Sequence, residues 1–193
     1  MFYHASPVEG INILEPRISN HKRPSVYLSK KRENVLPYLS NAVEKYCKET
    51  GFSHGGPWYK WASYGFHQGL LRLDEYYPNA LEDTYRGVSG YIYRADQVPG
   101  GAEQEDIPGA VVTSQPVPVS GCEFVPDAYE AILRAEKEGL LLVRRYKEMP
   151  EGMLSWIDAT IKREYEQSAG IPTYRHFLNN KFPEILGAGG GNA

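Results

Sequence analysis

The sequence has few of the features that mark secreted, membrane-spanning or metal-binding proteins. Its only two cysteines, Cys47 and Cys122, lie far apart with no C-x-x-C spacing, which argues against a disulfide framework or a cysteine zinc cluster. The N-terminus has no basic stretch followed by an apolar segment, and no run of about 18 apolar residues occurs. We therefore expect a protein of the reducing cytoplasm with no membrane partner.

An excess of positive charge is also absent. The chain has 21 basic and 24 acidic residues and a formal net charge of −3, so nothing gathers a phosphate backbone and nucleic acid is disfavoured as a main partner. The motifs H-E-x-x-H and G-x-S-x-G are missing, as is a phosphate-binding glycine loop between a strand and a helix. No metal site is expected, because the acidic residues at 103, 105 and 106 resemble a solvated loop.

What the chain does have is the composition of one compact domain. It contains 193 residues, of which 41% are hydrophobic and 23% charged, enough to bury a core without disulfides or metal. We predict a single domain over residues 1–186, followed by a flexible glycine-rich tail over 187–193. Fifteen tyrosines and three tryptophans exceed the needs of a minimal core and are typical of concave sites or partner surfaces.

Hydrophobic periodicity predicts a mixed set of strands and helices. The predicted strands cover residues 1–5, 25–29, 90–94, 110–113 and 140–146, with an extended edge segment at 115–119. The predicted helices cover residues 34–49, 78–86, 126–138, 150–167 and 173–181. In the first helix, Asn34 is the expected N-cap, Pro37 falls in the first turn, and Gly51 ends the helix. Residues 7–24 and 97–108 are expected to be loops.

Three short segments near the N-terminus form a recognisable combination. One predicted strand ends in Tyr3-His4-Ala5-Ser6, another ends in Val26-Tyr27-Leu28-Ser29, and Tyr38 follows Tyr27 by eleven residues. This pattern resembles the first two motifs of the diphtheria-toxin and poly(ADP-ribose) polymerase branch of the ADP-ribosyltransferases. The resemblance covers roughly forty residues and implies an α+β fold with an ADP-ribosyltransferase-like split β-sheet core and short flanking helices.

The resemblance also implies roles for these residues toward NAD, the substrate of that family. His4 would hydrogen-bond a ribose hydroxyl, and the Ala5 backbone would hold the nicotinamide carboxamide with support from Ser6. Tyr27 and Tyr38 would enclose the nicotinamide ring, whose positive charge is attracted to an aromatic face.

The third motif of the family departs from the pattern. The family places a glutamate at the start of a late strand, where its charge stabilises the ribosyl cation. Here the corresponding catalytic position is Gln115, whose amide can keep a hydrogen bond but carries no charge. Glu123 lies eight residues later, and the sequence leaves open which of the two faces the cleft. Val35 also stands where related enzymes often keep a serine.

The sequence therefore supports three hypotheses. The first is an NAD-dependent ADP-ribosyltransferase-like protein that transfers ADP-ribose to an unidentified acceptor or hydrolyses NAD. The second is a catalytically inactive nucleotide-binding or protein-interaction module, and the third is an RNA 2′-phosphotransferase-like enzyme with a local basic groove. The aromatic stretch from Trp58 to Phe66 is either a lid over the nucleotide or a buried hairpin. Oligomeric state is left open.

Overall fold

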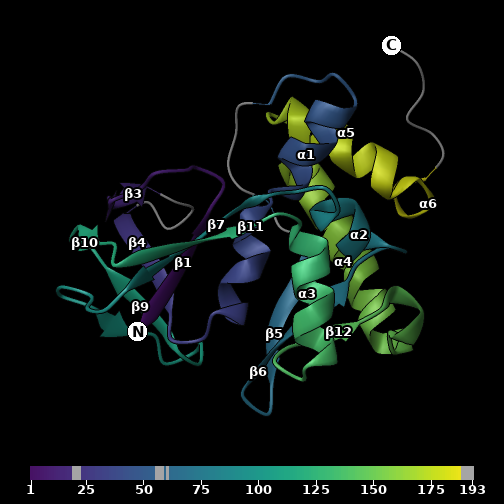
Figure 1. The fold of residues 1–193 in the computed structure, drawn as a ribbon. Helices are drawn as coiled ribbons and strands as arrows, with labels where there is room; N and C mark the ends of the chain where they lie inside the picture. Colours follow the sequence, from purple (N-terminus) through teal and green to yellow (C-terminus); the bar gives the residue numbers. More distant parts are fainter. Residues whose placement is uncertain (19–22, 55–58, 60, 188–193) are drawn as a thin grey trace.

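The computed structural model describes residues 1–18, 23–54, 59 and 61–187 (Figure 1). Its strands are β1 (Phe2–Ser6), β2 (Ile13–Leu14), β3 (Arg17–Ile18), β4 (Pro24–Ser29), β5 (Ala62–His67), β6 (Leu70–Glu75), β7 (Gly90–Ala95), β8 (Ala102–Glu103), β9 (Ala110–Thr113), β10 (Val117–Pro118), β11 (Gly121–Val125) and β12 (Leu142–Arg144). Its helices are η1 (Glu33–Leu39), α1 (Ala42–Glu49), α2 (Ala80–Tyr85), α3 (Ala128–Lys137), η2 (Tyr146–Glu148), α4 (Glu151–Gln167), α5 (Pro172–Lys181) and α6 (Pro183–Leu186), where η denotes a 3-10 helix.

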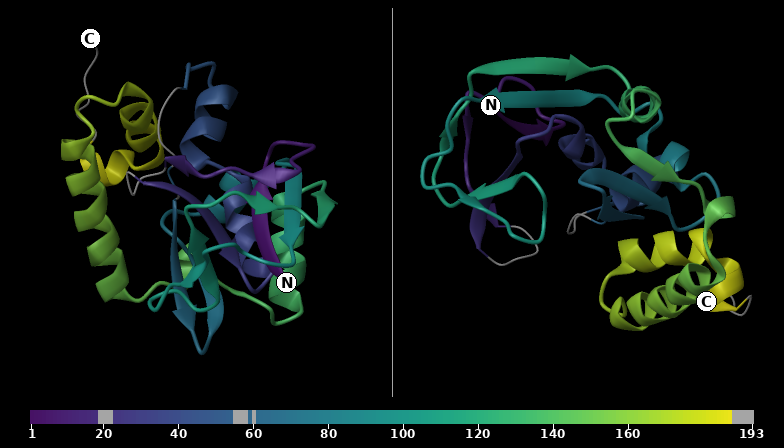
Figure 2. Two further views of the ribbon diagram at one scale, coloured as in Figure 1. Left: turned by 90° about the vertical axis from the view of Figure 1, so that its left-hand side faces the viewer. Right: turned by 90° about the horizontal axis from the view of Figure 1, so that it is seen from below.

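The main sheet consists of two groups of strands that meet at one residue pair. Its order is β11-β7-β1-β4-β9-β8, with β3 also paired to β4. Five residue pairs join β1 to β7 and four join β4 to β9, whereas Tyr3 and Ser29 form the single pair between β1 and β4. The right-hand view in Figure 2 shows β4 turning away from β7 and β11. Beyond this pair, β1 and β4 therefore diverge.

A smaller sheet of order β12-β6-β5 lies beside the main one. The strands β5 and β6 form a hairpin whose turn residues, Gln68 and Gly69, both have positive φ, as the right-handed twist of a two-residue hairpin turn requires. The strand β12 pairs with β6 in parallel, which brings the chain after α3 back to the hairpin. A two-residue ladder between β2 and β10 completes the pairing.

Three buried clusters hold these elements together. The first joins η1, α3 and both sheets through residues such as Leu36, Ile92 and Ile132, none of which is exposed to solvent. The second packs α1, α4, α5 and α6 around the buried rings of Trp61 and Phe177. The third lies on the opposite face of the main sheet and includes Val26, Leu28, Tyr93 and Val117. Each Å² of apolar surface that these clusters remove from water contributes about 25 cal/mol, so their burial is the main stabilising force.

Most of the predicted elements are confirmed. The strands predicted at 25–29, 90–94 and 110–113 are β4, β7 and β9, and the edge segment at 115–119 contains β10. The helix α3 begins where predicted, because the Asp127 side chain accepts hydrogen bonds from the backbone N–H groups of Tyr129 and Glu130. Gly51 and Gly139 follow the ends of α1 and α3 with positive φ. The mixed α+β class is therefore correct.

The prediction of one helix over residues 34–49 is wrong. The segment divides into η1 and α1, with Ser40 extended at φ −127° between them. Pro37 has no N–H and disfavours an α-helical turn, while the buried Ser40 hydroxyl donates to the Thr84 carbonyl oxygen. Asn41 caps α1 by accepting from the Glu44 N–H, so Asn34 is not the N-cap and lies buried inside η1.

Other differences are local. The strand β11 was not predicted, and the strand predicted at 140–146 is shortened to Leu142–Arg144 because Tyr146 begins η2. The predicted loops contain the two-residue strands β2, β3 and β8, whereas the helix predicted over 150–167 is confirmed as α4. Trp58 and residues 188–193 lie outside the described residues. Within the described part of the chain, no helix combines the length and the apolar character needed to cross a membrane.

Candidate functional site

His4 lies where β1 and β4 separate. Its Nδ1 is 2.8 Å from the backbone carbonyl oxygen of Tyr27. A carbonyl oxygen only accepts hydrogen bonds, so Nδ1 carries the proton and donates, and the Nε2 of the neutral ring keeps a lone pair. Burial lowers the pKa of His4 from its ordinary value, the Tyr27 hydrogen bond partly offsets this, and the charge of Arg17 lowers it further. His4 is therefore a neutral acceptor at pH 7.

The residues after His4 form the free edge of β1. Ala5 is buried opposite Ile92 of β7, and Ser6 lies opposite Tyr91 and accepts a hydrogen bond from the Val8 N–H. Successive residues of a strand direct their N–H and C=O groups to opposite edges. Because the β4 ladder ends at Tyr3, backbone donors and acceptors of this segment are directed toward the gap between β1 and β4. Such groups bind a planar amide well.

Tyr38 packs on Tyr64, which is hydrogen-bonded to a third tyrosine, Tyr85. Burial raises the pKa of Tyr38, and the Tyr27 phenol raises it further. Half of Tyr38 is exposed to solvent, and its ring packs edge to face on Tyr64 with 6.3 Å between centroids. The Tyr64 and Tyr85 hydroxyl groups are 2.7 Å apart, and the Tyr85 hydroxyl also donates to the Pro37 carbonyl oxygen. These hydrogen bonds tie η1, the helix that contains Tyr38, to α2 and β5.

The supporting tyrosines were not found by sequence reasoning. Tyr64 belongs to the aromatic stretch whose role the sequence left open, and β5 places it in a hairpin that packs on the first core cluster. Tyr85 was read only as the end of a helix. Neither residue has a spacing relative to Tyr38 that indicates contact, because the contact depends on how the β5–β6 hairpin packs against η1.

Gln115 lies just beyond β9, on the other side of β4 from β1. Its backbone N–H donates to the Thr113 hydroxyl, and its side-chain amide lies against Gly100 so closely that a Cβ there would be 2.6 Å from Nε2. Glu123 lies on β11, where its carboxylate accepts from Nε of Arg32 at 2.9 Å and also from Nη2. Hydrogen bonding to Arg32 lowers the pKa of Glu123. His4 is thus bonded to the Tyr27 backbone and Tyr38 packs on Tyr64, whereas Gln115 lies against Gly100 and Glu123 is bonded to Arg32.

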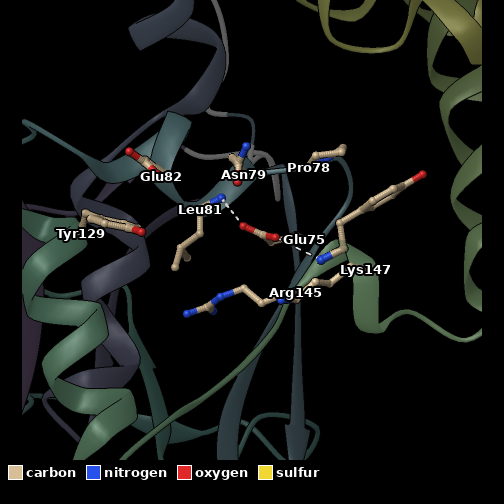
Figure 3. A pocket seen from close by; sticks show the side chains of 9 residues that line it. Glu75, Pro78, Asn79, Leu81, Glu82, Tyr129, Arg145 and Lys147 are labelled. Carbon is tan, nitrogen blue, oxygen red and sulfur yellow. Dashed lines mark hydrogen bonds between the residues drawn. The ribbon is translucent and has the colours of Figure 1, made fainter.

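A separate cavity of about 320 Å³ lies between β6, α2, α3 and η2 (Figure 3). The buried Glu75 carboxylate at its wall accepts from the backbone N–H groups of Leu81 and Tyr146 at 3.1 and 3.0 Å. These bonds use both carboxylate oxygens to hold α2 and η2 in place, so Glu75 is a structural group. None of the sequence-predicted site residues lines this cavity. Among the described residues, no group of His, Cys, Asp and Glu side chains is arranged to hold a metal ion.

The state of His4 gives a direct test of this geometry. We expect His4 to titrate below its usual value of about 6.5 and to be the Nδ1–H tautomer when neutral. Since the folded-state pKa is lowered, the contribution of His4 to stability is complete above pH 6.5 and is lost as the pH falls toward the folded-state value. Two-bond ¹H–¹⁵N NMR of the imidazole, followed through a pH titration, measures both properties. A Nε2–H tautomer or a raised pKa would contradict the Tyr27 hydrogen bond.

Family models, curated proteins and solved structures contain no match to this chain. The function is therefore argued from the residues themselves. What is shown is a mixed α+β protein in which the His4 imidazole bonds the backbone carbonyl oxygen of Tyr27 at the point where two strands of the main sheet separate.

Proposed function

We propose that the chain is an ADP-ribosyltransferase-like protein that binds NAD between β1, β4 and η1. The observation that carries the proposal is the hydrogen bond from His4 to the Tyr27 carbonyl oxygen at the point where β1 and β4 separate. It leaves Nε2 of His4 as an acceptor next to an unpaired strand edge, with the half-exposed Tyr38 close to Tyr27. An acceptor, a backbone edge and aromatic rings are the groups that a nicotinamide ribose requires.

Each group has a defined role in this proposal. The Nε2 lone pair of His4 accepts a hydrogen bond from a ribose hydroxyl, and the free edge of β1 at Ala5 pairs with the carboxamide. The cationic nicotinamide ring packs against Tyr27 and Tyr38, a contact worth roughly 0.5–2 kcal/mol. Arg17 on β3, whose charge reaches His4, adds positive potential for the NAD diphosphate.

The chemistry that follows is breakage of the bond between nicotinamide and ribose. Nicotinamide leaves as a neutral molecule with the bonding electrons, and the ribose carbon takes on oxocarbenium character. An acceptor oxygen or nitrogen, or water, forms the new bond and gives up its proton to solvent. A carboxylate close to the cation accelerates this step. Gln115 supplies no charge, and the Glu123 carboxylate is already neutralised by Arg32.

This charge deficit favours a second candidate within the same fold. A protein with Gln115 at the third motif position binds NAD through its remaining groups and releases nicotinamide slowly or not at all. It then acts as a nucleotide-binding or interaction module. The two candidates make the same prediction for NAD binding and opposite predictions for nicotinamide release.

NAD binding is tested by thermal unfolding with and without millimolar NAD. A ligand that binds only the folded state raises Tm in a concentration-dependent way. At a concentration a hundredfold above Kd it increases the free energy of unfolding by about 2.7 kcal/mol. We expect a rise for the wild type and loss of most of it for His4→Ala, which removes the ribose contact. Nicotinamide release, measured by chromatography on the same samples, separates the active candidate from the inactive one.

The matched control is His67→Ala, an exposed histidine at the end of the β5–β6 hairpin. It makes the same chemical change away from the proposed site, and its NAD-induced shift should equal that of the wild type. Absence of a shift in the wild type refutes NAD binding. An equal shift in His4→Ala refutes the site at His4 while leaving binding elsewhere on the chain.

A further inference from the structure

Asp74 on β6 is held by two arginines on the face of the smaller sheet opposite Leu71 and Leu73, which belong to the first core cluster. Arg72 contacts its carboxylate through Nε and Nη2 at 2.9 and 3.1 Å, and Arg144 of β12 does so through the same two atoms at 2.9 Å each. Each carboxylate oxygen therefore accepts one bond from each arginine. Asp74 itself is fully buried. Four charge-assisted hydrogen bonds from two bidentate pairs fix both guanidinium planes.

The charges in this cluster do not balance. One carboxylate faces two guanidinium groups, so the cluster carries a net charge of +1. The Arg72 and Arg144 side chains are only 27% and 23% exposed, which makes an excess charge costly unless an anion compensates it. The neighbouring acid, Glu75, is already bonded to backbone N–H groups.

Each arginine also has N–H donors that the bonds to Asp74 do not use. A guanidinium group has five N–H bonds, and each arginine uses two of them on Asp74. The edge formed by Nε and Nη2 is occupied, while the end-on edge formed by Nη1 and Nη2 keeps one N–H on each nitrogen. Together the two arginines offer two end-on forks from one face of the sheet. A single fork satisfies a carboxylate, whereas two forks match the three terminal oxygens of a phosphate group.

Aromatic side chains and a glycine surround the two arginines. Ser63 pairs with Asp74 across the β5–β6 ladder, and its side chain hydrogen-bonds Tyr76, whose ring packs edge to face on Trp156 of α4 at 6.0 Å. Gly65 lies opposite Arg72, and a Cβ at this position would be 3.8 Å from Nη2, so Gly65 itself places no side chain against the guanidinium. Trp156 is 47% exposed.

We propose that Arg72 and Arg144, positioned by Asp74, form a phosphate-binding site on the face of the β5-β6-β12 sheet opposite Leu71 and Leu73. The ligand is inorganic phosphate or the phosphate group of a monoester, and an aromatic monoester gains a second contact with Tyr76 and Trp156. The two arginines lie on β6 and β12, elements that carry none of the residues proposed to contact NAD.

The test is a titration of the wild-type protein followed through the arginine Nε–Hε signals in ¹H–¹⁵N NMR. Inorganic phosphate and phenyl phosphate are expected to shift the Arg72 and Arg144 signals saturably at millimolar concentration, while acetate at equal ionic strength does not. Tighter binding of phenyl phosphate identifies an aromatic monoester as the ligand class, and equal binding identifies the free anion. Because this measurement needs no variant, it does not depend on a substitution that disturbs folding.

Substitutions then test whether the Arg144 fork binds phosphate. Arg144→Lys keeps the charge but removes the fork, and we expect about a tenfold or greater weakening of phosphate binding from the lost bidentate contact. Arg163→Gln, which removes an exposed arginine of α4, is the matched control and should bind as the wild type does. Unshifted Arg72 and Arg144 signals at saturating phosphate, or shifts that acetate reproduces, would overturn the proposal.

Discussion

Replacing Asp74 with alanine is expected to lower the free energy of unfolding by about 3–5 kcal/mol, the usual cost of removing one partner of a buried ion pair. The substitution leaves Arg72 and Arg144 largely buried, facing each other with like charge and without the four hydrogen bonds of the wild type. Because β12 joins β6 at this point through Arg144, the loss also loosens the parallel pairing. Urea unfolding followed by tryptophan fluorescence measures the change.

Two further variants interpret the result. Asp96→Ala removes an exposed aspartate that follows β7 and should change stability by less than about 0.5 kcal/mol. The double variant Asp74→Ala with Arg144→Met removes the unpaired charge and should recover part of the loss, as a double-mutant cycle detects. A loss below about 1 kcal/mol in Asp74→Ala would mean that the two guanidinium groups rehydrate in the folded protein.

The elements that the sequence predicts well are those whose signals are local. The strand Ala110–Thr113 is bounded by Gly109 and Ser114, and α3 is bounded by Asp127 and Gly139. Alternation, an N-cap and a C-terminal glycine act within a few residues, so they identify an element regardless of what packs on it.

The division at Ser40 shows where local signals fail. The apolar spacing of residues 35–47 fits one helix, but the Ser40 hydroxyl bonds to Thr84, a residue more than forty positions away. Strand β11 escapes prediction for a related reason. It is the edge strand of the main sheet, with Cys122, Glu123 and Phe124 all exposed, so alternation does not mark it.

The candidate site also has a part that local sequence signals predict and a part that depends on the tertiary fold. The spacing of His4, Tyr27 and Tyr38 resembles the family pattern, so the sequence alone predicts a nucleotide site at these residues. The bond of His4 to the backbone of Tyr27 depends on the divergence of β1 and β4. The Arg72 and Arg144 cluster depends on the parallel register that aligns Arg144 with Asp74, residues seventy positions apart. No local pattern encodes that register.

If Gln115 occupies the catalytic position, replacing it with glutamate is expected to raise nicotinamide release from NAD by about 10²–10³-fold, the size of the loss when one group that stabilises transition-state charge is removed from an enzyme. The glutamate side chain has the same length as glutamine and adds a full negative charge toward the ribosyl cation. Release should rise with pH through the ordinary carboxyl pKa near 4.3 and be constant at neutral pH, where the carboxylate is ionised. Chromatography of nicotinamide under single-turnover conditions measures the rate.

The matched control for this gain of activity is Gln104→Glu, which adds the same charge on an exposed loop between β8 and β9. It should leave release at the wild-type rate, and both variants should keep the NAD-induced rise in Tm. A Gln115→Glu protein that binds NAD but releases no additional nicotinamide would remove Gln115 from the catalytic position. Loss of residual release in Glu123→Gln would then assign the carboxylate role to Glu123. In that case the bond from Arg32 must open when NAD binds, because a carboxylate neutralised by a guanidinium offers little charge to a cation.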